Sequence, residues 1–278
     1  MSLLIEPEIL ATLLNDEQVI ILDARFSLAN RREGQALFDQ GHIPGAIYAD
    51  LESDLSGDIC PGKTGRHPLP AQDQFTDTLR TWGVTEHSLV VVYDDGGHAM
   101  AARAWWLLRW AGVNCVCVLH GGLKAWLAAR YPVTTESFSR VQSTLLPAFS
   151  SMPTVTAEKL HKELGSDSMV CIDARSQERF NGEVEPLDAK AGHIPGALCH
   201  PFVKNMDEQG RFLSPEQLRA QFNALIPKGS TPVFYCGSGV TACHNILAME
   251  YAGLNNAVLY PGSWSEWITE PGRPVANS

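Results

Sequence analysis

The stretch "ILDARFSLANRREGQALFDQGHIPGA" at residues 21–46 returns in altered form as "CIDARSQERFNGEVEPLDAKAGHIPGA" at residues 171–197. Both copies contain DAR and, further on, GHIPGA. Two more pairs of segments follow in the same order: "LVVVYDDGG" (89–97) with "TPVFYCGSG" (231–239), and "HGGLKAWLA" (120–128) with "YPGSWSEWIT" (260–269). Self-similarity with a period of about half the chain indicates a duplicated structural unit.

Each copy alternates short apolar, β-branched runs with segments of helical periodicity. This alternation predicts an α/β fold with a mainly parallel sheet in each of two domains. With 278 residues, 45% of them hydrophobic, the chain is long enough for two cores. The expected strands are Val19–Leu22, Leu89–Tyr93 and Cys115–Leu119 in the first copy, and Met169–Ile172, Pro232–Tyr235 and Ala257–Tyr260 in the second.

Two local signals refine this organisation. Ser214, Pro215 and Gln217 form a capping-box pattern before "LRAQFNAL", which predicts a helix start. The stretch 134–153 is rich in Ser and Thr, ends in a proline and lacks periodicity, so it is the expected linker. We place the domain boundary near residue 145, which gives domains 1–145 and 146–278.

Composition argues against several classes of function. The formal net charge is -10, and no basic run could neutralise a phosphate backbone, so nucleic acid is not an expected partner. The N-terminus has no cation before Arg25, and no apolar stretch is long enough to span a membrane, which predicts a soluble protein without a signal peptide. Seven scattered cysteines without a CxxC pair argue against a disulfide framework and a zinc site, and favour the cytoplasm.

The second copy places a cysteine where a strand should end. In "PVFYCGSGVTA", Cys236 follows the strand, and Gly237 and Gly239 let the backbone curl so that successive N–H groups point toward one spot. A helix that starts near Val240 or Thr241 adds the positive end of its dipole. Such a cradle stabilises an anion, so we expect Cys236 to be a nucleophilic thiolate. The alternative is a small buried thiol that only fills space.

The first copy has Asp94 at the matching position. A carboxylate cannot store sulfur or act as a soft nucleophile, so only the second half is expected to be chemically active. The remaining cysteines are interpreted as packing residues: Cys115 and Cys117 lie two apart in a strand, and Cys243 lies inside the presumed helix.

The repeated DAR and GHIPGA, the loop "CGSGVT" and the closing "PGSWSEW" together resemble the tandem rhodanese, or sulfurtransferase, family over essentially the whole chain. The resemblance implies two rhodanese-like domains, a catalytic C-terminal one and an inactive N-terminal one. It also implies a cysteine that cycles through a persulfide without a metal or organic cofactor. The loop is similar to that of the 3-mercaptopyruvate sulfurtransferases, whereas the thiosulfate enzymes typically carry basic residues after the cysteine. A physical reason supports this distinction, since Gly237 and Ser238 supply no cation for the thiosulfate dianion.

The resemblance further implies a substrate-binding arginine between DAR and GHIPGA, which falls on Arg179. A guanidinium can hold a carboxylate with two hydrogen bonds. The alternative is a surface ion pair with Glu178 or Glu183. A second arginine is common after EP in the mercaptopyruvate enzymes, but this chain reads "EPLDAK" there, with only Lys190 nearby. A thiosulfate:cyanide sulfurtransferase that uses the same cysteine therefore stays open.

The resemblance to the mercaptopyruvate enzymes also implies a Ser-His-carboxylate arrangement that polarises the substrate. Ser238 fits the serine, His67 in "GKTGRHPLP" the histidine, and Glu52 the carboxylate; the alternative for His67 is an exposed loop histidine. The expected substrate-binding residues are Arg179, Gly237, Gly239, Val240 and Thr241. Residues shared by both copies are interpreted as structural: Asp23 with Arg25, Asp173 with Arg175, His42, His193, Trp126 and Trp267.

The predicted activity is sulfur transfer from 3-mercaptopyruvate through Cys236 to a thiol, thioredoxin or cyanide. The sequence disfavours two other classes of function. A Cys-dependent phosphatase needs an arginine six positions after the cysteine, where this chain has Ala242. A sulfur-carrying or partner-binding module without catalysis would be indicated by loss of the second cysteine, and Cys236 is present.

Overall fold

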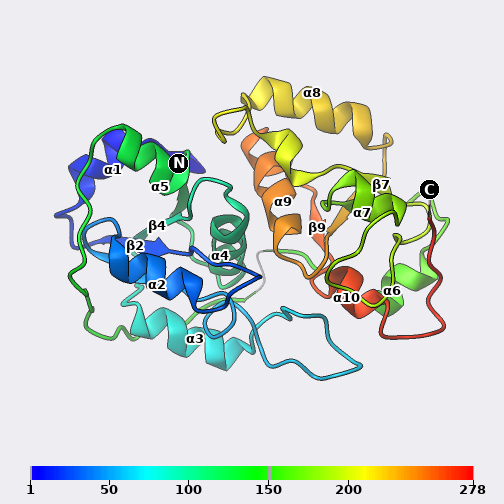
Figure 1. Ribbon diagram of the computed structural model, residues 1–278, viewed down its shortest axis with the longest axis horizontal. Coiled ribbons are helices and arrows are strands. Elements are labelled where there is room, and N and C mark those ends of the chain that lie inside the picture. Colours follow the sequence, from blue (N-terminus) through cyan, green and yellow to red (C-terminus); the bar gives the residue numbers. More distant parts are fainter. Residues whose placement is uncertain (1, 150–151, 278) are drawn as a thin grey trace. The chain divides into compact units, whose positions relative to one another are not determined.

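The computed structural model describes residues 2–149 and 152–277, and the chain divides into two compact units (Figure 1). Unit 1 comprises Met1–Gly57, Pro70–Ser151 and Glu208–Phe212; unit 2 comprises Asp58–Leu69, Met152–Asp207 and Leu213–Ser278. Each unit therefore contains one copy of the repeat and a short segment from the other half of the sequence.

Each unit is built on a parallel sheet, as the repeat predicts. The strands are β1 (Leu4–Ile5), β2 (Val19–Asp23), β3 (Ala46–Tyr48), β4 (Leu89–Tyr93) and β5 (Val116–Leu119) in unit 1, and β6 (Met169–Asp173), β7 (Leu198–Cys199), β8 (Thr231–Tyr235) and β9 (Val258–Leu259) in unit 2. The strand orders are β1-β5-β4-β2-β3 and β7-β6-β8-β9, and the neighbouring strands run parallel. The two sheets share a register, since Asp23 pairs with Tyr93 and Asp173 pairs with Tyr235.

Helices connect the strands. They are α1 (Pro7–Leu13), α2 (Glu33–Gln40), α3 (Gln72–Thr81), α4 (Ala99–Trp110) and α5 (Gly122–Ala128) in unit 1, and α6 (Ala157–Lys162), α7 (Gln177–Asn181), the 3-10 helix η1 (Phe202–Asn205), α8 (Pro215–Leu225), α9 (Thr241–Tyr251) and α10 (Ser263–Trp267) in unit 2. The predicted capping box opens α8: Ser214 Oγ accepts from Gln217 N–H at 3.3 Å, and Gln217 Oε1 accepts from Ser214 N–H at 3.0 Å.

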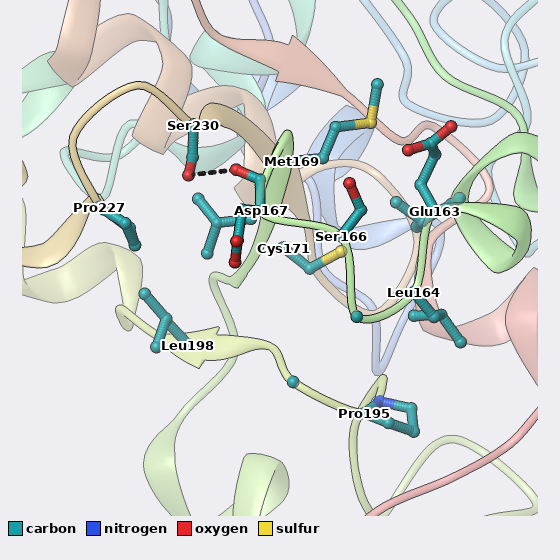
Figure 2. Close-up of a pocket in the computed structure, with 14 residues that line it drawn as sticks. Glu163, Leu164, Ser166, Asp167, Met169, Cys171, Pro195, Leu198, Pro227 and Ser230 are labelled. Atoms are coloured by element: carbon teal, nitrogen blue, oxygen red, sulfur yellow. Dashed lines mark hydrogen bonds between the residues drawn. The ribbon is translucent and has the colours of Figure 1, made fainter.

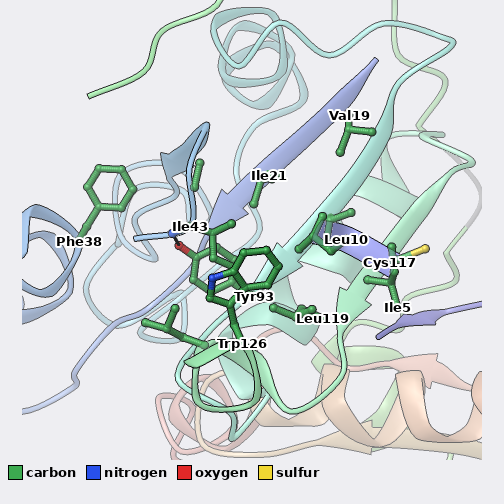
Figure 3. Close-up of a cluster of buried hydrophobic side chains, with 13 residues drawn as sticks. Ile5, Leu10, Val19, Ile21, Phe38, Ile43, Tyr93, Cys117, Leu119 and Trp126 are labelled. Carbon is green, nitrogen blue, oxygen red and sulfur yellow. Dashed lines mark hydrogen bonds between the residues drawn. The ribbon is translucent and has the colours of Figure 1, made fainter. Parts of the chain in front are cut away.

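Both faces of the central strands are buried, which explains why their sequences are apolar throughout. Alternate residues of β4 point to opposite faces. Tyr93 joins a core with Leu10 of α1 and Trp126 of α5 (Figure 3). On the other face, α4 packs against β4 and β5 and contributes the fully buried Trp105 and Trp106.

The DAR motifs connect the end of a strand to the GHIPGA turn. In unit 1, Arg25 Nη2 donates to Asp23 at 2.7 Å and to the Gly41 carbonyl at 2.8 Å. In unit 2, Arg175 Nη2 makes the same pair of contacts, with the Asp173 carboxylate and the Gly192 carbonyl, at 2.7 Å each. These buried ties agree with the structural role expected for DAR. The remaining residues shared by both copies make intra-unit contacts of the same kind: His42 with Phe38, His193 with Phe180, Trp126 with Pro132 and Trp267 with Pro274.

The six expected strands are present, each within one residue at either end. The sequence prediction missed β1, β3 and β7, whose two or three residues are too short to carry a periodic signal. The described part of the expected linker, 134–149 and 152–153, has no helix or strand apart from a single bridge at Thr134, and its residues 150 and 151 lie outside the described residues. Cys117 and Cys243 are buried as expected, while Cys115 is half-buried.

A buried polar network in unit 2 ties η1 to α9, the helix that follows the cysteine loop. Asn205 Oδ1 lies 2.9 Å from His200 Nε2, and Asn205 Nδ2 donates to Asn245 Oδ1 at 2.7 Å and lies 3.1 Å from His244 Nδ1. Asn245 Nδ2 donates to the His200 carbonyl at 3.0 Å. Burial lowers the pKa of His200 below its ordinary value of 6.5.

This lowered pKa predicts a loss of stability in mild acid. The unfolded chain binds a proton at His200 at a pH where the folded chain does not, so the free energy of unfolding falls as the pH drops through about 6.5. In urea titrations between about pH 7 and pH 5, we expect His200→Gln, which keeps a donor for Asn205, to show a shallower fall than wild type. The exposed His87→Gln is the control and should keep the wild-type slope. Equal slopes for His200→Gln and wild type would contradict the assignment.

Candidate active site

The cysteine loop starts at the carboxyl end of β8, the strand between β6 and β9. Cys236 follows Tyr235 directly and is 2% exposed, and the loop leads into α9 at Thr241. The carboxyl end of an inner parallel strand is where α/β folds bind ligands. The strand end, the loop and the helix start therefore lie together as the sequence predicts.

Three hydrogen bonds fix the position of Cys236. The Gly239 N–H donates to its Sγ at 3.2 Å. Its own N–H donates to Ser263 Oγ at 3.1 Å, and its carbonyl accepts from the Trp264 N–H at 2.9 Å. A backbone donor is thus directed at the sulfur, as the predicted anion cradle requires.

Ser263 was missed by the sequence analysis. It is fully buried, has a φ of +56°, and its Oγ donates to the Tyr260 carbonyl at 3.0 Å. The matching residue of unit 1 is Gly122, with a φ of +57°. A serine in a glycine-favouring conformation is strained, and here its hydroxyl holds the amide of Cys236. The signal lay in the repeat itself, where "PGSW" has a serine opposite the second glycine of "HGGL".

Ser238 and His67 form a buried pair beside the cysteine. Ser238 Oγ lies 2.8 Å from His67 Nδ1, and the two residues are 6% and 4% exposed. His67 is therefore not the exposed loop histidine that was the alternative. It belongs to the segment Asp58–Leu69, which folds with unit 2 although it comes from the first half of the sequence. Arg66 anchors this segment, since its N–H donates to Ser265 Oγ of α10 at 3.1 Å.

Glu52, the expected carboxylate of the arrangement, has a different partner. It belongs to unit 1, where its Oε1 lies 2.9 Å from Arg31 Nε. The Arg31 side chain is 72% exposed, so this contact is a surface ion pair.

Two guanidinium groups cover Gly237, the residue after the cysteine. A Cβ at Gly237 would lie 2.8 Å from Arg66 Nη2 and 3.5 Å from Arg179 Nη2. Burial lowers the pKa of Arg66 below its ordinary value, but the guanidinium stays protonated at neutral pH. Arg66 is the second residue that the sequence analysis missed, because it lies 170 positions before the cysteine. The loop itself supplies no cation, as predicted, but cations reach it from elsewhere.

Arg179 pairs with acids other than the adjacent ones at positions 178 and 183. Its Nη2 lies 2.7 Å from Glu185 Oε1 and 3.3 Å from Asp188 Oδ2. Both carboxylates are 4% exposed. The arginine is therefore part of a largely buried ion cluster and not of a surface pair.

The same cluster includes two further arginines. Asp188 Oδ1 also bonds Arg66 Nη1, and Glu185 Oε2 lies 3.2 Å from Arg175 Nη1. Lys190 is exposed and contributes its backbone, because its carbonyl accepts from the Trp264 indole N–H at 2.8 Å.

In unit 1, Asp94 fills the matching cradle with its own carboxylate. Its Oδ1 accepts from the N–H groups of Gly96 and His98 at 2.9 Å each, and its Oδ2 from those of Met100 and Ala101 at 3.2 Å each. The backbone donors that would stabilise a thiolate or a bound anion are thereby satisfied internally.

A separate cavity of about 270 Å³ lies in unit 2 near the start of β6 (Figure 2). It is lined by Met169 and Cys171, together with Pro195 and Leu198. Burial raises the pKa of Cys171 to about 12, so this thiol is not a nucleophile at neutral pH. None of the described residues around the cavity is a lysine or arginine. The cavity is therefore not built to bind an anion.

Among the described residues, no group of three or more His, Cys, Asp or Glu side chains is placed to hold a metal ion. No helix within 2–149 or 152–277 combines the length and apolar character needed to cross a membrane.

A family model for the rhodanese-like domain matches residues 6–129 and 156–270, one match in each copy of the repeat. The chain belongs to the rhodanese family. Within this family, a Pseudomonas aeruginosa protein named as a probable 3-mercaptopyruvate sulfurtransferase is 48% identical over 275 residues, covering 96% of this chain and 95% of that protein. Thiosulfate sulfurtransferase of Bos taurus is 34% identical, over 89% of this chain and 84% of that protein.

The crystal structure of SseA from Escherichia coli, described as a 3-mercaptopyruvate sulfotransferase, matches this rhodanese with a TM-score of 0.84. The two are 32% identical, and the match covers 96% of this chain and 100% of SseA. These relatives place the chain among the sulfurtransferases, as the sequence analysis predicts.

The Cys236 loop of this rhodanese requires glycine at 239. The φ of Gly239 is +80°, and a Cβ there would lie 2.3 Å from the Pro261 carbonyl oxygen. We expect Gly239→Ala to lower the free energy of unfolding by about 2 kcal/mol more than Gly229→Ala. Gly229 is a matched control because its φ is +89° but a Cβ there meets nothing within 4 Å. Urea denaturation measures both; an equal loss would show that the contact with Pro261 is accommodated.

Proposed function

We propose that this sulfurtransferase takes sulfur from 3-mercaptopyruvate onto Cys236 and passes it from the resulting persulfide to a thiol, a thioredoxin-like protein or cyanide. The observation that carries this proposal is the grouping around one sulfur: a backbone donor on Cys236, the Ser238–His67 pair and two arginines over Gly237. The mercaptopyruvate assignment is further supported by the 48% identical relative.

In the first step the Cys236 thiolate attacks the sulfur of the donor. A bond forms between the two sulfurs, the carbon–sulfur bond breaks, and its electron pair leaves as the enolate of pyruvate. The enolate takes up one proton to become pyruvate, and the persulfide releases one, so protons balance. Each of the two sulfurs is formally oxidised by one electron and the donor carbon is reduced by two, so the electrons balance. No metal or external oxidant enters this scheme.

Ser238 and His67 are suited to the negative charge that develops on the ketone oxygen. The hydroxyl can donate a hydrogen bond to that oxygen, and the imidazole 2.8 Å away can exchange a proton with the hydroxyl. Both side chains are buried, which strengthens such interactions relative to water. Arg179 would hold the donor carboxylate with its planar guanidinium, and the N–H groups of Gly237, Gly239, Val240 and Thr241 would line the same pocket.

Thiosulfate is the second candidate donor, and the position of the arginines favours it. The absence of a cation in "CGSGVT" argues against a dianion, but Arg66 and Arg179 bring two positive charges to Gly237 from outside the loop. The relatives named thiosulfate sulfurtransferase agree with this alternative.

Unit 1 is proposed to be catalytically inactive, because Asp94 occupies its own cradle. A reducing compartment such as the cytoplasm is proposed for the protein, since all seven cysteines are free thiols.

A single turnover tests the proposed nucleophile. Mixing the enzyme with one equivalent of 3-mercaptopyruvate should release one equivalent of pyruvate and add the mass of one sulfur atom to the peptide that contains Cys236. Cys236→Ser should abolish both signals, whereas Cys171→Ser, a buried thiol with a raised pKa, should retain them. Persulfide formation on Cys236→Ser would refute the assignment.

Steady-state kinetics separates binding from polarisation. Ser238→Ala and His67→Gln should each lower kcat by about 100-fold with a small change in KM, because the pair acts on the developing charge. Arg179→Gln should instead raise KM for 3-mercaptopyruvate by about 10-fold or more, because it removes a charged partner of the donor carboxylate. A KM effect at Ser238 with unchanged kcat would reassign that residue to binding.

A further inference from the structure

The substrate-binding side of the site contains an acid that the proposed reaction does not use. Asp188 is 4% exposed, and its two carboxylate oxygens contact different arginines: Oδ1 bonds Arg66 Nη1, and Oδ2 lies 3.3 Å from Arg179 Nη2. These are the two guanidinium groups that reach Gly237. Asp188 thus holds the two cations in the way that a donor carboxylate would.

Asp188 differs from its neighbour Glu185 in how it is anchored. Glu185 accepts hydrogen bonds from Arg175, Arg179 and the backbone N–H groups of Leu187 and Asp188. The hydrogen bonds of the Asp188 carboxylate run to the two arginines. Its segment between α7 and His193 contains no helix or strand, and Leu187 beside it is 46% exposed. Displacing Asp188 would therefore break side-chain contacts and leave the helices and strands intact.

The charges of the cluster set the preference for a donor. Three arginines, at positions 66, 175 and 179, face three carboxylates, at 173, 185 and 188, so the formal charge of the cluster is zero. If Asp188 leaves, one carboxylate of mercaptopyruvate restores the same charge beside these arginines, whereas thiosulfate brings one negative charge more than Asp188 removes.

We propose, on the basis of the proposed function, that Arg66 is the second cation of the donor site. Asp188 acts as a placeholder: its carboxylate binds Arg66 and Arg179 until the donor carboxylate displaces it. Arg66 then acts as the second substrate-binding arginine, in place of the one that mercaptopyruvate enzymes commonly have after "EP". The placeholder keeps both guanidinium groups aligned and neutralised while the site is empty. It also disfavours dianionic donors, which meet the most repulsion from its carboxylate.

The test measures anion binding without turnover. In a Cys236→Ser background, calorimetry gives the Kd of pyruvate, a monoanion, and of thiosulfate, a dianion. Asp188→Asn should tighten both, thiosulfate by about 10-fold and pyruvate by less, because a competing negative charge is removed. Arg66→Gln should weaken both by about 10-fold, because one charged partner is lost. A decrease in both Kd values in Asp188→Asn, together with an increase in both in Arg66→Gln, supports the role of Asp188 as a placeholder.

The matched control is Glu183→Gln, which removes one negative charge from the same segment but lies outside the arginine cluster and is exposed. It should leave both Kd values within about twofold of the parent. Weaker or unchanged binding in Asp188→Asn, with unfolding free energy like that of the parent, would overturn the placeholder. If Asp188→Asn is unstable, Asp188→Ser repeats the measurement with the same expected signs.

This outcome is separable from failure of the proposed function. Absence of persulfide on wild-type Cys236 would refute the reaction, whereas the Kd values in the Cys236→Ser background report on the placeholder alone. With the active enzyme, Asp188→Asn should also raise the ratio of kcat/KM for thiosulfate to that for 3-mercaptopyruvate by about threefold or more. An unchanged ratio would contradict the proposed role in donor preference.

Discussion

The structure of the site depends on keeping several arginines close together near the Cys236 loop. Positive charges at such distances repel strongly in a partly buried environment, so each must be separated from the next by a carboxylate. Asp173, Glu185 and Asp188 provide that separation, and two of the acids come from the irregular segment between α7 and the GHIPGA turn. This requirement explains why an acid-rich, otherwise unstructured stretch is tied so firmly to the sheet.

The two copies of the repeat differ in how the backbone N–H groups of their loops are satisfied. Both place a loop at the carboxyl end of the inner strand, and both direct backbone N–H groups into it. In unit 1 the side chain that follows the strand is Asp94, whose own carboxylate satisfies these donors. In unit 2 the side chain is Cys236, and Ser263 replaces a glycine to hold its amide. The two copies thus differ in what their backbone donors meet: the carboxylate of Asp94 in unit 1 and the thiol of Cys236 in unit 2.

Much of this could be predicted from the sequence because the duplication repeats its own signals. DAR, GHIPGA and the strands around Tyr93 and Tyr235 are local patterns, and comparing the copies showed that their loops differ at Asp94 and Cys236. Arg66 could not be predicted in the same way, because its proximity to Gly237 arises from the folding of a distant segment and not from any spacing along the chain. Ser263 was visible as an exception in the aligned repeats, but its role depends on a backbone angle. Glu52 was expected, from the family resemblance alone, to be the carboxylate of the Ser-His-carboxylate arrangement. In the structure it forms a surface ion pair with Arg31.

The segment Asp58–Leu69 has a consequence for how the two halves can be inherited. It carries Arg66 and His67, yet it folds with the unit encoded by the second half of the gene, while Glu208–Phe212 of the second half folds with the first unit. Neither half is therefore a self-sufficient module that could be excised, shuffled or replaced by an unrelated partner without losing part of its own body. Each half depends on the other for part of its own fold, which gives a physical reason for the chain to retain both copies.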